Sequence, residues 1–143
     1  MRTLLLLPLL LLPLTGCSAI MDVVHSENES HFDDGAALFD SGAIDANDAP
    51  WLPTDATDIM LRESTKTDVT ATAVLGFASD SSLIDCTKTD RLSLPAYSVG
   101  WGPDDDRLVK TETVYSCGDW AFIPTADGWF GWTPSAPDEK SAA

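Results

Sequence analysis

The sequence predicts a small single domain of the α+β or mainly β class, with about five antiparallel strands and one short helix. Three observations carry this prediction. Apolar and polar residues alternate in several short runs, Gly, Pro and Asp separate those runs, and Thr and Val are frequent within them. A chain of 143 residues leaves room for one core of modest size.

The first segment of the chain is typical of an export signal. Arg2 precedes an apolar run from Leu4 to Leu14, and small residues follow. A helix needs about 20 apolar residues to cross a bilayer, so this run is too short for a transmembrane anchor. We therefore interpret residues 1–16 as a signal peptide.

Leu14, Thr15, Gly16 and Cys17 resemble the bacterial lipobox. The resemblance implies that the Cys17 thiol receives a diacylglyceryl group and that the chain is cut just before this cysteine. Two acyl chains on one residue hold a protein at a membrane far better than one chain does. The expected location is the outer face of the bacterial cell membrane. An ordinary signal peptide with a chance cysteine remains the alternative.

Residues 17–50 are rich in Asp, Asn, Ser, Gly and Ala and poor in large apolar residues. Such a composition buries too little apolar surface to offset the entropy of ordering. We expect a lipidated N-terminus followed by a disordered acidic tether. Both histidines of the chain, His25 and His31, fall in this segment.

The folded domain is predicted to span residues 51–134, starting at the apolar cluster around Trp51. Ile59 and Leu61 alternate with polar residues, and residues 68–77 place apolar side chains at every second position, so the two runs predict a hairpin. Residues 81–86 favour a short helix, and residues 94–106 favour a long loop.

The last third of the chain predicts three further strands. Residues 109–116 alternate as a strand does, and residues 120–123 and 129–133 form a hairpin around a tight turn at residues 125–128. Alternation places Trp129 on one face of the last strand, and Phe130 and Trp132 on the other. Residues 135–143 predict a flexible tail.

Cys86 and Cys117 form an even pair once Cys17 is assigned to the lipid. Exported proteins meet an oxidising environment, so this pair predicts a disulfide bond. A redox or metal site is the alternative, but the two cysteines lie far apart in sequence and lack CxxC spacing.

Residues from about 50 to 134 resemble a family of small uncharacterised lipoproteins of actinobacteria. The resemblance rests on the block from Trp51 to Ile59, the cysteines Cys86 and Cys117, and the segment from Gly118 to Pro134. It implies an exported domain with one disulfide bond, and it implies no activity.

Charge and motifs exclude several classes of function. The chain has 23 acidic and 8 basic residues, and its net charge of −15 disfavours binding to nucleic acid or to anionic lipid. Residues 51–134 contain no histidine, so Ser-His-Asp and Cys-His arrangements cannot form within them. The sequence predicts neither a cofactor nor a metal site.

The acidic residues leave two alternative functions open, a hydrolase and a calcium site. Paired carboxylates could support a cell-wall hydrolase, and the candidates are Asp85, Asp104, Asp105, Asp106, Asp119 and Asp127. The Asp104 to Asp106 triplet could instead bind calcium, although its spacing does not match an EF-hand.

Aromatic residues are the most suggestive feature of the sequence. Five of them in the last third form a candidate binding surface: Trp101, Trp120, Trp129, Phe130 and Trp132. Exposed rings would bind a glycan or a protein partner, whereas buried rings would only fill the core. We therefore expect a non-enzymatic lipoprotein that binds an envelope protein or glycan, with a hydrolase or a purely structural surface component as alternatives.

Overall fold

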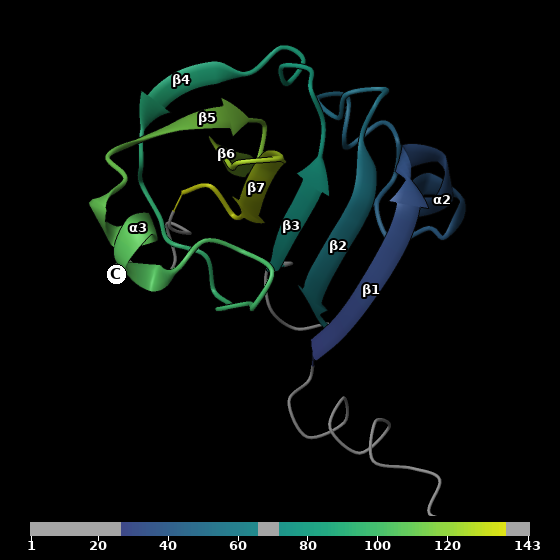
Figure 1. Cartoon of the computed structure of the whole chain (residues 1–143), viewed down its shortest axis with the longest axis horizontal. Coiled ribbons are helices and arrows are strands. Elements are labelled where there is room, and N and C mark those ends of the chain that lie inside the picture. Colours follow the sequence, from purple (N-terminus) through teal and green to yellow (C-terminus); the bar gives the residue numbers. More distant parts are fainter. Residues whose placement is uncertain (1–26, 66–71, 137–143) are drawn as a thin grey trace, which may run out of the picture.

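The computed structural model describes residues 27–65 and 72–136, which form one seven-stranded antiparallel sheet with two short helices (Figure 1). The strand order is β1-β2-β3-β7-β6-β5-β4. The mainly β class is confirmed, but the expected strand number of about five is too low. The elements are β1 (Glu27–Asp34), α2 (Gly35–Asp40), β2 (Thr57–Ser64), β3 (Ala73–Ala78), β4 (Thr87–Asp90), α3 (Asp105–Lys110), β5 (Thr113–Cys117), β6 (Trp120–Pro124) and β7 (Gly128–Thr133).

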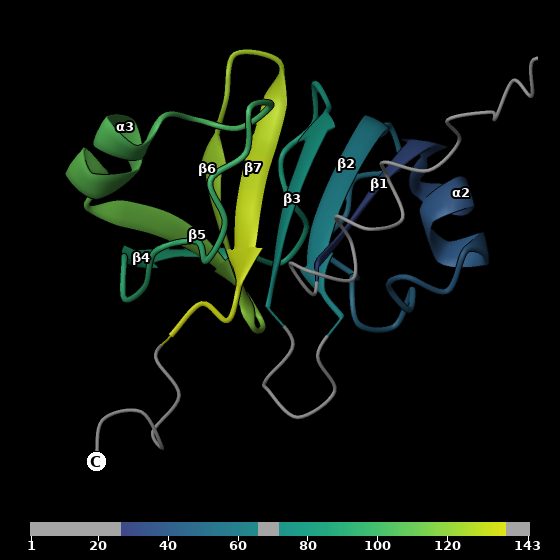
Figure 2. The same ribbon diagram turned by 90° about the horizontal axis from the view of Figure 1, so that it is seen from below.

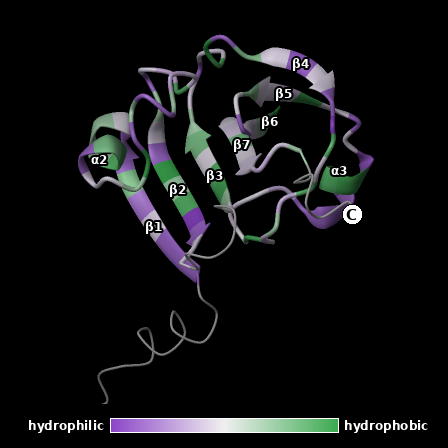
Figure 3. Ribbon diagram, turned by 180° about the vertical axis from the view of Figure 1, so that it is seen from behind, coloured by the Kyte–Doolittle hydropathy of each residue, from purple (hydrophilic) through white to green (hydrophobic). Residues whose placement is uncertain are grey.

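The described part of the fold starts with β1, well before residue 51. β1 pairs with β2 along its length, with Glu29 opposite Arg62 and Phe32 opposite Ile59. Residues 27–50 are therefore folded, and the prediction of a disordered tether is wrong for them. An edge strand gains its order from the backbone of its neighbour, so a mostly hydrophilic sequence can form one (Figure 3).

The helices also lie elsewhere than predicted. Residues 81–86 form bends and not a helix. The helices α2 and α3 are capped at their N-termini by Asp34 and Asp104, whose side chains accept hydrogen bonds from the backbone nitrogens of Ala37 and Arg107. The second edge strand, β4, is fully exposed and was not predicted. Residues 109–110 belong to α3, so the strand expected at 109–116 starts later.

Both faces of the sheet are buried against other segments. The α2 face carries Ile59, Leu61, Leu75, Phe77 and Phe122, which pack with Leu38 of α2 and with Trp51 and Leu52. The α3 face carries Val74, Val114, Ala121, Ile123, Phe130 and Trp132, which pack with Leu108 of α3 and with Val99. Figure 2 shows α2 beside β1 and β2 at one end of the sheet and α3 at the other.

The two predicted hairpins are present. β2 and β3 pair through Leu61 and Leu75, and β6 and β7 pair through Ile123 and Phe130. The predicted alternation holds where the structure describes it, since Ala73, Leu75 and Phe77 all lie in the same core.

The predicted disulfide bond between Cys86 and Cys117 is confirmed, with the two Cα atoms 4.7 Å apart. It ties the segment before β4 to the end of β5.

Candidate functional site

The five candidate aromatic residues do not form one exposed row. Trp120 is 9%, Phe130 2% and Trp132 1% exposed, so these three rings belong to the core. Trp101 and Trp129 remain partly exposed. Of the five residues proposed as a binding surface, Trp120, Phe130 and Trp132 are therefore core residues.

Alternation along β7 and a covering loop explain this division. Phe130 and Trp132 point to the α3 face, as the sequence predicted, and Trp129 packs against the core of the α2 face. Residues 91–104 cross the α3 face, and the Ser93 hydroxyl accepts a hydrogen bond of 2.9 Å from the Trp132 indole nitrogen. The buried set is the one that this loop covers.

Three of the five candidate residues nevertheless line one pocket of about 280 Å³, which we call the aromatic pocket. It lies next to the start of β2, the end of β3 and the turn between β6 and β7. Its apolar lining includes Trp101, Trp129, Phe130 and Met60, and its charged lining consists of Asp58, Asp127 and Arg107. Apolar walls with a few polar groups are typical of small-molecule binding sites.

Trp101 is fixed in this pocket by contacts at both ends of its ring. A Cβ atom at Gly76 of β3 would lie 3.0 Å from the Trp101 Cζ3 atom, so the absence of a side chain there lets the indole approach the strand. The indole nitrogen donates a hydrogen bond of 3.2 Å to the Glu29 carboxylate of β1. Trp101 also lies 6.0 Å from Phe130 between ring centroids.

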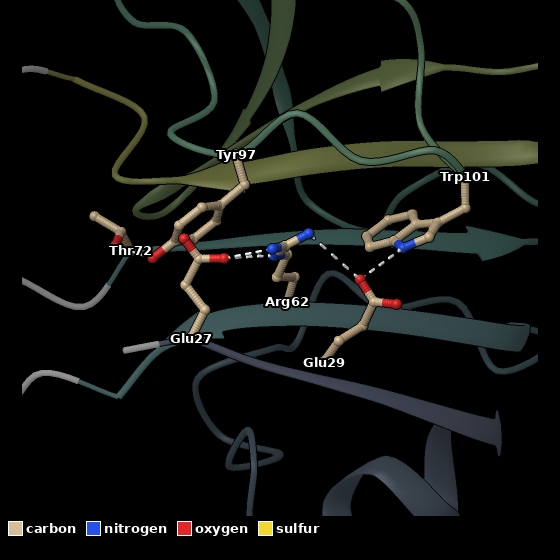
Figure 4. A network of polar contacts seen from close by, with 6 residues as sticks. All are labelled: Glu27, Glu29, Arg62, Thr72, Tyr97 and Trp101. Carbon is tan, nitrogen blue, oxygen red and sulfur yellow. Dashed lines mark hydrogen bonds and ion pairs between the residues drawn. The ribbon is translucent and has the colours of Figure 1, made fainter. Parts of the chain in front are cut away.

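A polar network on β1 and β2 holds the Glu29 carboxylate in turn (Figure 4). The Arg62 guanidinium donates to Glu27 through Nε at 2.8 Å, and its Nη1 lies 3.8 Å from the Glu29 carboxylate. The same guanidinium lies 5.8 Å from the centre of the Tyr97 ring. The Tyr97 hydroxyl forms a hydrogen bond of 3.1 Å with Thr72. The loop that carries Trp101 is therefore attached to the sheet at two points.

His31 contacts a residue that lines the same pocket. Its Nε2 lies 2.7 Å from the carboxylate of Asp58, which lines the pocket. Asp58 has a φ of 52°, at an irregularity in the β2–β3 register. The sequence placed His31 in a disordered tether, so this contact was missed; pairing across two strands leaves no local signal in sequence.

A second cavity, of about 780 Å³, lies on the α2 face between the residue 42–51 loop and the β5–β6 turn. Trp51, Trp120, Glu63 and Asp119 are among its lining residues. Burial raises the pKa of the Glu63 carboxyl above its usual value. The Trp51 indole nitrogen is buried without a hydrogen-bond partner among the described residues.

The remaining candidate carboxylates are dispersed. Asp104 caps α3, Asp105 accepts a hydrogen bond of 3.1 Å from the Ser98 hydroxyl, and Asp106 lies in the first turn. Asp85 is exposed in the bend before Cys86, while Asp119 and Asp127 line different cavities. Within residues 27–65 and 72–136, no three His, Cys, Asp or Glu side chains are grouped to hold a metal ion.

Cys17, the predicted lipidation site, lies outside the described residues. None of the helices in the described ranges is both long and apolar enough to cross a membrane.

Comparison of the chain with protein families, with curated proteins and with solved structures found no match.

Proposed function

We propose that this protein is a lipid-anchored module on the outer face of the bacterial cell membrane, and that it binds an envelope protein or glycan without catalysis. The signal segment and the lipobox-like Cys17 support the anchor. The observation that carries the binding role is the aromatic pocket, which is lined by partly exposed Trp101 and by the charged residues Asp58, Arg107 and Asp127.

The arrangement of Trp101 favours binding over simple core filling. A partly exposed indole held by a hydrogen bond to Glu29 and by contact with Gly76 is rigid before any ligand arrives. Preorganisation lowers the entropy that a ligand must offset when it binds. Exposed aromatic rings in a concave site are typical of recognition surfaces.

A carboxylate-dependent cell-wall hydrolase is the second candidate, and Glu63 favours it. A carboxyl whose pKa is raised by burial can act as a general acid, and Asp119 lines the same cavity. Release of soluble fragments from purified cell walls, lost in Glu63→Gln, would support this candidate over a binding module. A purely structural surface component would show neither release nor saturable binding.

The anchor is tested by Cys17→Ala. We expect an uncleaved precursor without lipid, because the thiol is the atom that would accept the diacylglyceryl group. Detergent partitioning and mass spectrometry of the intact protein measure this. A variant that is still processed and still enters the detergent phase would contradict the anchor.

Binding is tested by capture from solubilised envelope with the full-length protein as bait. We expect saturable capture by the wild type and loss of capture in Trp101→Ala. Leu92→Ala is the matched control, because Leu92 is 63% exposed and is not among the pocket's lining residues. Equal capture by the wild type and Trp101→Ala would contradict the assignment of the pocket.

A further inference from the structure

We propose that the aromatic pocket binds one uncharged sugar ring, which stacks on Trp101 while its hydroxyls bond to Asp58, Asp127 and Arg107. This inference rests on the proposed function, and it names the ligand class of the same site.

The size of the pocket limits the ligand. Drug-sized ligands occupy pockets of about 300 to 1,000 Å³, and the aromatic pocket, at about 280 Å³, lies just below this range. It therefore suits a single ring with its substituents. A peptide segment would need a longer groove to accept several successive side chains.

The lining of the pocket matches both the apolar and the polar surface of a sugar ring. A sugar ring has an apolar face of C–H groups, which packs against an indole, and a perimeter of hydroxyls that both donate and accept hydrogen bonds. Partly exposed Trp101 supplies the apolar surface, and buried Phe130 supports it from behind. Asp58 and Asp127 supply acceptors and Arg107 supplies donors. Arg107 already donates a bond of 2.7 Å to the Pro124 carbonyl, which fixes its guanidinium beside the β6–β7 turn.

Charge selects against acidic sugars. Two carboxylates and one guanidinium line the pocket, and the neighbouring surface beside Arg107 has three carboxylates, from Asp104, Asp105 and Asp106, and one further cation, from Lys110. The whole chain carries a net charge of −15. A uronate, sulfate or phosphate group on the ligand would be repelled by this field.

Trp101 acts through its fixed orientation, and Glu29 is the positioning residue. Glu29 accepts a hydrogen bond from the indole nitrogen, and the Trp101 side chain stays partly exposed beside the pocket. Glu29→Ala removes this hydrogen bond and leaves the indole side chain of Trp101 itself unaltered. Gly76→Ala adds a Cβ atom 3.0 Å from the ring and displaces it. Both variants should weaken sugar binding without removing any group that touches the sugar.

The test is a glycan array probed with the full-length protein purified in detergent. We expect binding to glycans that end in neutral hexoses, pentoses or N-acetylhexosamines, and no binding to uronic-acid, sulfated or sialylated glycans. Trp101→Ala should reduce the retained signal at least tenfold, and Glu29→Ala about threefold. Leu92→Ala should match the wild type, and thermal melting identifies any variant that fails to fold.

The outcomes separate this inference from the proposed function. Capture of an envelope protein that depends on Trp101, with no glycan bound, would overturn the sugar assignment and support the binding module. A preference for acidic glycans would also overturn the inference. Failure of Trp101→Ala to change either glycan binding or protein capture would overturn both proposals.

Discussion

Glu29 and Trp101 are 72 residues apart in sequence, yet their side chains form a hydrogen bond of 3.2 Å between the Glu29 carboxylate and the indole nitrogen. The contact joins the first described strand to the loop that crosses the α3 face (Figure 4). The first described strand after the proposed lipid anchor in sequence therefore orients the Trp101 ring of the candidate binding site.

Glu29→Ala should increase the mobility of Trp101 at a small cost in stability. A hydrogen bond contributes about 0.5 to 1.5 kcal/mol net, and the partial exposure of Glu29 places the loss at the lower end. Acrylamide quenching of fluorescence, in a background where Trp129 is replaced by Phe, should rise in this variant. Glu29→Gln keeps an acceptor oxygen and serves as the control. Unchanged quenching in Glu29→Ala would show that Gly76 and Phe130 alone hold the ring.

The disulfide bond should contribute a large share of the domain's stability. Closing the loop between Cys86 and Cys117, which are 31 positions apart, corresponds to about 3.5 kcal/mol in the chain-entropy account. Replacing both cysteines by Ser should therefore lower the midpoint of denaturant unfolding clearly. Alkylation without reduction should leave both residues unlabelled in the exported wild-type protein. Complete labelling there would contradict the bond.

Sequence patterns predicted those parts of the fold that depend on local apolar alternation. The hairpin of β6 and β7 follows from the alternation around Phe130 and Trp132, and the hairpin of β2 and β3 from Leu61 and Leu75. β1 has no such pattern, because Phe32 is its only large apolar residue. Its order comes from backbone pairing with β2, which composition does not reveal.

The candidate site was predictable in its aromatic members but not in its polar ones. Trp101 and Trp129 stood out in sequence, whereas their partial exposure depends on tertiary packing, Trp101 within the loop over the α3 face and Trp129 on the α2 face. His31 and Glu29 are brought next to the lining residues Asp58 and Trp101 by the pairing of β1 with β2, and this register is a property of the folded sheet. Glu63 gave no signal, since its cavity is built by five separate segments of the chain.

Trp132→Ala and Trp129→Ala should differ strongly in their effect on stability. Trp132 is 1% exposed and its indole nitrogen donates to Ser93, so its deletion should cost about 3 to 5 kcal/mol. Trp129 is partly exposed, and its deletion should cost clearly less. Equilibrium unfolding in urea measures both. Equal losses would show that Trp129 is as important to the core as Trp132.

Truncation should place the start of the domain near residue 27. A chain that begins at residue 27 should fold, and a chain that begins at residue 51 should not, because it loses β1 and the buried side chain of Leu38. β2, with Ile59 and Leu61, would then become an exposed edge. Circular dichroism and cooperative unfolding distinguish the two chains. Cooperative unfolding of the shorter chain would contradict this expectation and would show that the domain can fold from residue 51.

Glu63→Gln should stabilise the protein at neutral pH, and its advantage should disappear in acid. Burial raises the pKa of the folded-state Glu63 carboxyl above its usual value near 4.5, and no hydrogen bond to this side chain compensates within the described residues. The folded state therefore binds this proton more tightly than the unfolded state does.

The pH dependence follows from this difference. As the pH rises above 4.5, Glu63 ionises and the folded state loses stability. At lower pH the carboxyl is protonated in both states, so the loss disappears. Gln has nearly the same shape and no charge, so the variant should be more stable than the wild type at pH 7 and equal to it near pH 3. Urea unfolding at both pH values measures the difference, and Glu112→Gln, at an exposed position, is the control. A Glu63→Gln protein that is less stable at pH 7 would show that the carboxylate has a favourable partner in solution.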